Sequence, residues 1–173
     1  MPLTAHIRPA TVHDADVLPA IEQSAARAFR SIKDLSWLAD GDVMTAAEHR
    51  VIISASTCWV AVDDQDRLQA FLSAQCMDHE LHIHELSVRH EHQGQGIGRS
   101  LVLAAIQWAA DQALRAVTLT TFRDVPWNQP FYARLGFVTL DNDHLDERLG
   151  EILENEQDQG FSKRSRCAMM FLL

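Results

Sequence analysis

The chain reads LHIHELSVRHEHQGQGIGRS over residues 81–100, and this stretch decides the fold. Its first half alternates polar and apolar residues, which is typical of a β-strand. Its second half places Gly94, Gly96 and Gly98 at every second position. Glycine lets the backbone adopt unusual φ and ψ angles and lets a ligand approach closely. The stretch therefore predicts a strand that ends in a glycine-rich turn.

A helix is expected to begin near Gly96, directly after this turn. The following residues, RSLVLAAIQWAADQAL, carry apolar side chains at broadly helical spacing. A helix N-terminus presents unpaired N–H groups and the positive end of its dipole, so an anion such as a phosphate fits there. Arg99 would add a positive charge. These residues leave one alternative open, which is a tight strand-to-helix connection without a ligand.

The composition is that of an ordinary globular protein of one domain. The 173 residues are 47% hydrophobic and 23% charged, and no apolar run approaches the ~20 residues of a membrane span. The N-terminal MPLTAHIRPA lacks the basic and apolar pattern of a secretory signal, so we expect a cytoplasmic protein. The formal net charge of −9 disfavours nucleic-acid partners, which need clustered Lys and Arg, and suits a cationic substrate.

The cysteines and histidines do not form a metal-binding pattern. Cys58, Cys76 and Cys167 are odd in number, widely separated and set among apolar residues, which predicts buried free thiols. His82 and His84 on a strand supply at most half of a metal site. We therefore expect no metal.

The order of the predicted elements indicates a single α+β domain over residues 1–173. It has a mixed, mostly antiparallel sheet of about seven strands flanked by helices. The strands are expected at 4–9, 57–63, 68–77, 81–88, 116–122, 137–140 and 167–173. The strands at 81–88 and 116–122 are joined by a helical crossover and should run parallel.

Four local features refine this fold. Thr11 and Asp14 resemble a capping box that opens a helix through about residue 29, and Pro19 is expected to kink that helix or to delay its start. The acidic stretch 141–160 is interpreted as a solvated helix or a mobile insertion. The last strand, 167–173, is continuously apolar and is expected inside the sheet rather than at its edge.

Two motifs make the chain resemble the GNAT superfamily of N-acetyltransferases over nearly its whole length. Gln93-x-x-Gly96-x-Gly98 matches the family's (Arg/Gln)-x-x-Gly-x-(Gly/Ala) acetyl-CoA motif, and it lies between a strand and a helix as in the family. Further on, PFYARLGF is similar to the family's second block, with Tyr132 at its third position. The resemblance implies a three-layer fold whose sheet splays between its fourth and fifth strands.

The same resemblance implies acetyl-CoA as co-substrate. In the family, the diphosphate binds the amides of the turn, and pantetheine runs beside the fourth strand. The cofactor-binding residues predicted in this way are Leu86, Ser87, Val88, Gln93, Gly94, Gln95, Gly96, Ile97, Gly98, Arg99 and Ser100. One departure is that many members carry Asn seven residues before the tyrosine, where this chain has Val125.

The catalytic residues are predicted from a finer resemblance. HIHELSV at 82–88 is similar to the His-x-His-x-Leu-x-Val strand of arylalkylamine N-acetyltransferases, whose histidines help to remove the proton of the substrate ammonium. His82 and His84 are thus predicted to relay that proton, although two hydrogen-bonded structural neighbours would fit the same pattern. Glu85 becomes a base or a cation anchor if a bulge turns it to the substrate. Tyr132 aligns with the family's general acid.

The predicted function is acetyl-CoA-dependent acetylation of a primary amine of a small molecule. The amine would attack the thioester directly in a ternary complex, with a histidine base and a tyrosine acid, and backbone N–H groups of residues 86–88 would stabilise the oxyanion. Two alternatives are a protein or peptide amine acetyltransferase and a non-catalytic acyl-CoA-binding sensor. The identity of the amine and a homodimeric state are left open.

Overall fold

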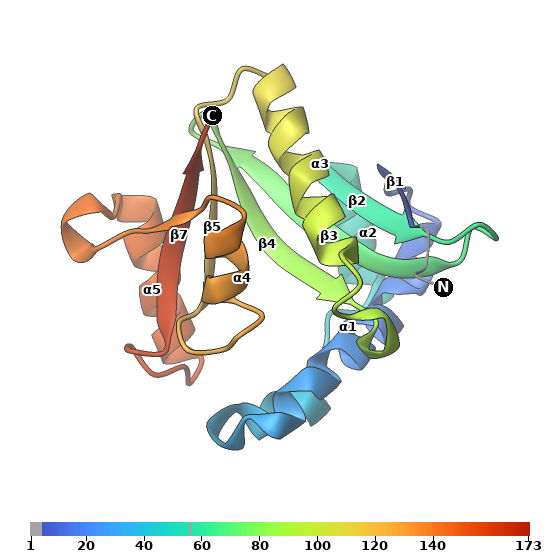
Figure 1. Cartoon of the computed structure of the whole chain (residues 1–173), viewed down its shortest axis with the longest axis horizontal. Helices are drawn as coiled ribbons and strands as arrows, with labels where there is room; N and C mark the ends of the chain where they lie inside the picture. The colour runs from blue at the N-terminus through green and yellow to red at the C-terminus, as the bar shows by residue number, and fades with distance from the viewer. Residues whose placement is uncertain (1–4, 56) are drawn as a thin grey trace. The chain divides into compact units, whose positions relative to one another are not determined.

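The computed structural model describes residues 5–55 and 57–173 (Figure 1). Seven strands form one sheet in the order β1-β2-β3-β4-β5-β7-β6. They span His6–Pro9, Thr57–Val62, Leu68–Met77, Glu80–Val88, Ala116–Phe122, Val138–Thr139 and Arg166–Leu172 for β1 to β7. The first residue of the predicted strand 4–9 lies outside the described residues. The order and the pairings confirm the predicted mixed, mostly antiparallel α+β sheet.

The chain divides into two compact units. Unit 1 comprises Met1–Cys76 and His84–Trp108, and unit 2 comprises Met77–Ile83 and Ala109–Leu173. One boundary therefore lies inside β4, between Ile83 and His84. The prediction that residues 1–173 form one domain stays a prediction. None of the helices formed by the described residues combines the length and the apolar character that crossing a bilayer requires.

Unit 1 carries helices on both faces of its strands (Figure 1). Its 3-10 segments are η1 (Asp14–Asp16), η2 (Arg27–Ser31), η3 (Lys33–Asp40) and η4 (His90–His92). Its α-helices are α1 (Leu18–Ala26), α2 (Ala46–Ala55) and α3 (Ile97–Asp111) as far as Trp108. Val60 of β2 belongs to the core cluster with Leu18 and Ile21 of α1. Trp59 points to the other face, where its ring meets Trp108 of α3 edge-on at 5.9 Å. Because successive side chains of a strand point to opposite faces, Val60 packs against α1 on one face and Trp59 against α3 on the other.

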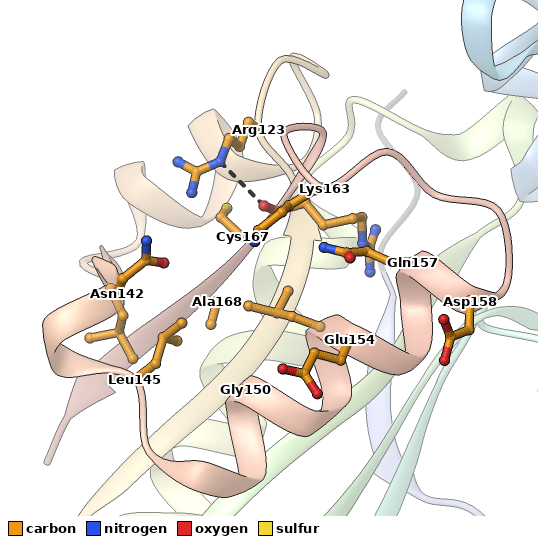
Figure 2. A pocket seen from close by; sticks show the side chains of 13 residues that line it. Arg123, Asn142, Leu145, Gly150, Glu154, Gln157, Asp158, Lys163, Cys167 and Ala168 are labelled. Atoms are coloured by element: carbon orange, nitrogen blue, oxygen red, sulfur yellow. Dashed lines mark hydrogen bonds between the residues drawn. The ribbon is translucent and has the colours of Figure 1, made fainter.

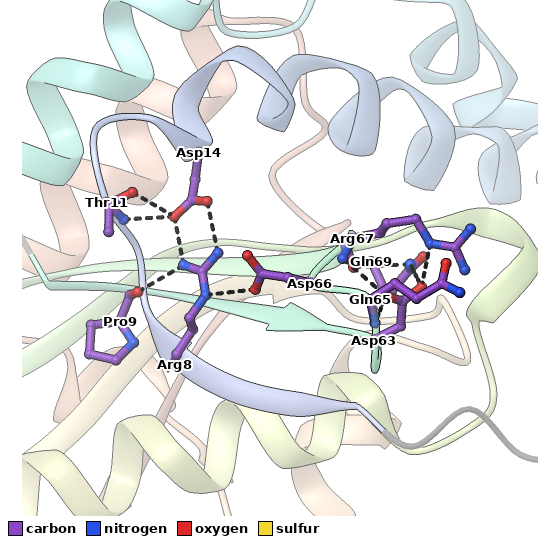
Figure 3. A network of polar contacts seen from close by, with 9 residues as sticks. All are labelled: Arg8, Pro9, Thr11, Asp14, Asp63, Gln65, Asp66, Arg67 and Gln69. Carbon is purple, nitrogen blue, oxygen red and sulfur yellow. Dashed lines mark hydrogen bonds and ion pairs between the residues drawn. The ribbon is translucent and has the colours of Figure 1, made fainter.

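Only half of the capping box predicted at Thr11 forms, with Asp14 at its centre (Figure 3). The N-caps of η1 and α1 are His13 and Val17, and neither makes a side-chain cap bond. The Asp14 carboxylate accepts hydrogen bonds from the Thr11 amide at 2.7 Å and from both terminal nitrogens of Arg8 at 2.8 and 3.0 Å. Burial alone would raise the pKa of Asp14, but the bonds from Arg8 and Thr11 outweigh it and the pKa is lowered. The α-helix then begins at Leu18, with Pro19 in its first turn. Pro19 therefore delays the helix, and the predicted continuous helix to residue 29 is wrong, because a 3-10 segment replaces its last turn.

Asp63 organises the turn between β2 and β3 (Figure 3). Its carboxylate accepts hydrogen bonds from the amides of Gln65 at 2.9 Å and Arg67 at 3.0 Å. The side chains of Arg67 and Gln69 donate to the same carboxylate at 2.8 and 3.0 Å. These bonds form a hairpin turn, whose strands β2 and β3 pair antiparallel.

Unit 2 is built around β5. The first part of β4 pairs parallel with β5, from Glu80↔Ala116 to Ile83↔Leu119, and β7 pairs antiparallel with β5 along its whole length. Because β6 pairs with the far side of β7, the last strand lies inside the sheet, as predicted. The helical segments of this unit are α4 (Gln129–Arg134), η5 (Asn142–His144) and α5 (Glu147–Asp158).

Most of the acidic stretch 141–160 folds as the capped helix α5, which follows the short segment η5. Asp146 accepts a hydrogen bond from the Leu149 amide at 2.8 Å and so caps α5. Arg148 of α5 donates to the Glu80 carboxylate of β4, which is 1% exposed, at 2.5 Å. Of the two predicted alternatives, the helix is the one observed.

The three cysteines are free, as predicted. Cys58 and Cys167 are buried, and burial raises the pKa of the Cys58 thiol to about 11. Cys76 is exposed, so its predicted burial is wrong. The reason is its place near the end of β3, where the strand leaves the core and Gln75 is exposed as well.

Candidate active site

The glycine-rich turn joins β4 to α3 and is open to solvent. Gly94 and Gly96 have φ angles of +75° and +84°, a region that side chains other than glycine rarely adopt. A Cβ atom added at either position would meet no atom within 4 Å. Backbone conformation, and not crowding, is therefore what requires glycine at these two positions.

The amides of the first turn of α3 point out of the helix without an internal acceptor. The first i→i−4 bond of this helix runs from the Ser100 amide to the Gly96 carbonyl at 3.0 Å. The N–H groups of Ile97, Gly98 and Arg99 precede it and therefore have no partner within the helix. Arg99 is exposed beside them. Three amides and a cation at a helix N-terminus are groups that can bind an anion, and the anion site at this turn stays a prediction.

Gln93 ties this turn to two other elements of unit 1. Its side-chain amide donates to the Val88 carbonyl of β4 at 3.0 Å and to the Ala25 carbonyl of α1 at 3.3 Å. Ser24 of α1 adds a second link, because its hydroxyl accepts from the His90 amide at 3.0 Å. The side chain of Gln93 thus shapes the turn.

The end of β4 leads into the turn and belongs to the same unit. His84 is exposed, and its Nε2 lies 3.3 Å from Oε1 of Gln75. Glu85 is half-buried and accepts a hydrogen bond from the Ser87 hydroxyl at 2.7 Å. Leu86 is half-buried too. Unit 1 therefore brings together His84, Glu85 and the predicted cofactor-binding residues.

His82 lies in unit 2 and is buried. Its side chain is 2% exposed, and its Nδ1 is 2.9 Å from the Thr118 hydroxyl of β5. Arg148 of α5 reaches the same hydroxyl at 3.4 Å. This surrounding is that of a structural histidine, which was the alternative interpretation of the His-x-His pattern.

Tyr132 also lies in unit 2, in the short helix α4. Its ring is 6% exposed and meets Phe131 and Phe137 edge-on, with centroids 4.9 and 5.6 Å apart. The helix ends at Arg134 with Leu135 as its C-cap, and the next residue, Gly136, has a φ of +101°. Val125, at the position of the family's asparagine, is buried and 3% exposed.

Glu22 and His49 are polar residues of unit 1 that the sequence did not single out. Burial, and after it the charge of Glu85, raises the pKa of the Glu22 carboxyl from 4.5 to about 7. His49 is 2% exposed, and its Nε2 lies 3.4 Å from Oε2 of Glu22. The sequence held one signal for the burial of Glu22, which is that it directly follows Ile21, a residue of the apolar stripe of the helix.

A sequence model of the acetyltransferase (GNAT) family matches residues 18–137. The match includes more than half of the chain. The chain belongs to the acetyltransferase (GNAT) family. The resemblance predicted from the turn motif and from PFYARLGF is thereby confirmed. The finer resemblance to arylalkylamine N-acetyltransferases stays a prediction.

Individual relatives of this GNAT chain are distant. N-acetyltransferase 8B of Homo sapiens is 26% identical over 134 residues, which cover 74% of this chain and 58% of that protein. The PaiA N-acetyltransferase from Thermoplasma acidophilum in complex with coenzyme A superposes with a TM-score of 0.72 at 16% identity, over 99% of this chain and 100% of that one. The ribosomal-protein-S18-alanine N-acetyltransferase from Escherichia coli superposes with a TM-score of 0.70 at 14% identity, over 98% and 94%. At these identities the two structures show the fold.

This GNAT chain also has a cavity of about 460 Å³ in unit 2, beside α5 (Figure 2). Gly150 and Glu154 of α5 line it, together with Cys167 and Ala168 of β7. None of the sequence-predicted site residues is among its lining residues. In the described part of the chain, no three His, Cys, Asp or Glu side chains are grouped as metal ligands.

Proposed function

We propose that this GNAT chain is an acetyl-CoA-dependent N-acetyltransferase that acetylates a primary amine of a small molecule by direct attack in a ternary complex. The observation that carries the proposal is the turn from Gln93 to Ser100, with its positive-φ glycines and first-turn amides. It occurs in a chain that matches the GNAT family over residues 18–137. A cytoplasmic location is part of the same proposal.

The acyl donor would bind through its diphosphate at the turn. The N–H groups of Ile97, Gly98 and Arg99 can donate to phosphate oxygens, and the helix dipole and the Arg99 side chain add positive potential. The similar PaiA structure was solved in complex with coenzyme A, which supports this choice of anion.

The acceptor amine must lose a proton before it can attack the thioester. An alkyl ammonium has a pKa of ~10.4, so the amine is almost wholly protonated at neutral pH. His84 and Glu85 are the groups at the end of β4 that we propose for proton removal. His82 is the weaker proposal, because its side chain is buried against Thr118. Tyr132 would protonate the departing thiolate, as the family resemblance implies.

An acceptor screen tests the function. The protein is incubated with acetyl-CoA and a panel of arylalkylamines, diamines and polyamines, with a peptide carrying a free N-terminus and a lysine as a further acceptor, and free thiol is followed. Thiol release with a small amine supports the proposal, and release with the peptide alone would make the acceptor a protein. Saturable binding of coenzyme A without turnover of any acceptor would contradict the proposal and indicate an acyl-CoA sensor.

A further inference from the structure

The cavity beside α5 is formed entirely by residues of unit 2 (Figure 2). Gly150, Glu154 and Asp158 line it from α5, and their spacing of four residues places them on one face of this helix. Cys167 and Ala168 of β7 also line it, and both are buried. Its volume of about 460 Å³ lies in the range of small-molecule binding sites. None of these residues belongs to the glycine-rich turn, so a ligand here would be additional to acetyl-CoA.

Gly150 contributes open space to this face of α5. Its φ is not positive, unlike those of Gly94 and Gly96, so the backbone conformation does not require glycine. A Cβ atom added to Gly150 would meet no atom within 4 Å, so crowding does not require glycine either. Glycine is nevertheless less favourable than alanine within a helix. The helix therefore carries an unfavourable residue whose structural effect is to leave this part of the cavity wall without a side chain.

Four charged side chains line the cavity without an ion-pair partner among the described residues. They are exposed and comprise two cations and two carboxylates, namely Arg123, Lys163, Glu154 and Asp158. Arg123 donates one side-chain hydrogen bond, from Nε to the Arg166 carbonyl at 3.2 Å. The two terminal nitrogens of its guanidinium have no partner in the described part of the chain. Because the opposite charges do not pair with one another, both signs remain available to a ligand.

Arg166 lines the same cavity, but its charge is already compensated. Its Nε and Nη2 atoms donate to the two carboxylate oxygens of Glu156, each at 3.0 Å. Its guanidinium also lies over the Phe122 ring, with Cζ 4.4 Å from the centroid. These contacts make Arg166 a part of the cavity wall, and they leave Arg123 and Lys163 as the cations that a ligand can meet.

We propose that this cavity binds a free α-amino acid with an apolar side chain. The planar guanidinium of Arg123 can donate two parallel hydrogen bonds to a carboxylate, and Lys163 adds a second positive charge. Glu154 and Asp158 can accept hydrogen bonds from the ammonium group. A zwitterion with an apolar group is the class of ligand that uses both charges and the apolar surface of the cavity. That apolar surface comes from three half-buried leucines, Leu140, Leu145 and Leu153.

Calorimetric titration of the whole chain with L-leucine, in the absence of acetyl-CoA, tests the cavity. We expect saturable binding with a Kd of about 0.1–1 mM, since the charged groups are exposed and screened by solvent. Two analogues of L-leucine each lack one charge, because isocaproate has no ammonium and isopentylamine has no carboxylate. Each should bind about 10-fold more weakly than L-leucine, because it loses one set of charge-assisted hydrogen bonds.

Variants of the charged groups assign each end of the ligand. Arg123→Gln should weaken binding of L-leucine by about 10-fold without weakening that of isopentylamine, which has no carboxylate. Glu154→Gln combined with Asp158→Asn should weaken binding of L-leucine by a similar factor without weakening that of isocaproate. A variant that acted only by disturbing the fold would weaken the binding of all three compounds alike. Arg164→Gln and Glu151→Gln replace exposed residues that do not line the cavity, so these matched controls should change none of the affinities.

Gly150→Leu tests the space in the cavity without removing any charge. Leucine is a better helix former than glycine, so α5 should be retained, and thermal melting followed by far-UV circular dichroism checks this. The added side chain should lower the affinity for L-leucine by more than about 10-fold, because it occupies space that the ligand needs.

Three results would overturn the inference. One is that neither L-leucine nor L-phenylalanine binds saturably at concentrations up to about 10 mM. Another is that isocaproate or isopentylamine binds as tightly as L-leucine, which would exclude recognition of a zwitterion. The third is unchanged binding of L-leucine by Gly150→Leu, which would place the ligand outside the cavity. Because no titration contains acetyl-CoA and none depends on turnover, failure of the inference and failure of the proposed function are distinguishable.

Discussion

Replacing Arg148 by methionine should remove the ion pair between α5 and Glu80 at the start of β4, and so destabilise the fold. The Arg148 guanidinium donates to one oxygen of Glu80 at 2.5 Å, and Arg115 donates to the other at 3.0 Å. The two arginines differ in their exposure, because the side chain of Arg148 is 16% exposed and that of Arg115 is 64% exposed. Methionine keeps the long unbranched stem, so Arg148→Met removes chiefly the charged head.

The expected loss can be worked from these contacts. Removing one partner of a buried ion pair costs about 3–5 kcal/mol, because the other charge is left uncompensated. Two effects reduce this figure for Arg148. Arg115 remains bound to Glu80, and the variant also removes Nε and Nη1 of Arg148, which are buried without hydrogen-bond partners among the described residues, a defect worth about 1–3 kcal/mol. We therefore expect Arg148→Met to lower the free energy of unfolding by about 2–3 kcal/mol.

Urea denaturation followed by far-UV circular dichroism measures this loss as a lower transition midpoint at unchanged slope. Arg115→Met is the matched control and should cost about 0–1 kcal/mol, as an exposed ion pair does. Glu80→Gln combined with Arg148→Met leaves no buried charge and should recover most of the loss. Equal losses in the free energy of unfolding for Arg148→Met and Arg115→Met would refute the reasoning. So would a double variant whose loss equals the sum of the losses of its two single variants.

Three further predictions concern the turn, the N-terminal cap and the general acid. Gly96→Ala forces a residue with a side chain to a φ of +84° and should weaken coenzyme A binding, measured by calorimetry. Gly150→Ala is the control, because its new Cβ atom meets no atom within 4 Å in α5. It should leave binding unchanged and stabilise the protein by about 0.5–1 kcal/mol. Arg8 helps to lower the pKa of Asp14 against the effect of burial. The Asp14 carboxylate therefore stabilises the fold above pH 3.8, and this stabilisation is lost as the pH falls through the lowered pKa. The melting temperatures of Arg8→Gln and the wild type should differ near pH 7 and converge in acid. Tyr132→Phe should lower kcat for thiol release by about 10²-fold and spare coenzyme A binding, and an unchanged kcat would remove the residue from the mechanism.

Elements bounded by strong local signals could be predicted from the sequence almost residue by residue. The strands β3 and β5 have the bounds that were expected, Leu68–Met77 and Ala116–Phe122. The reason is that a cluster of turn-forming polar residues precedes β3, and that β5 is a run rich in Val, Thr and Phe, which favour strands. The glycine turn was predictable too, since only glycine serves well at the positive φ angles of Gly94 and Gly96.

The polar environments of the site could not be predicted in this way. Whether His82 is buried depends on Thr118 and Arg148, which come from β5 and α5 far along the chain. The raised pKa of Glu22 depends in the same way on tertiary burial and on Glu85, which lies more than sixty residues away in the sequence. Periodicity reports which residues share a face of one element, but not which groups of another element they meet.

The division of the chain inside β4 has a consequence for any attempt to take the molecule apart. Each unit is assembled from two separate stretches of polypeptide, since Met77–Ile83 is inserted into the sequence of unit 1 and belongs to unit 2. No single truncation can release either unit as one uninterrupted fragment. Limited proteolysis or terminal deletion should consequently yield incomplete pieces, and a ribosome must synthesise the chain as far as β7 before unit 2 has all its strands.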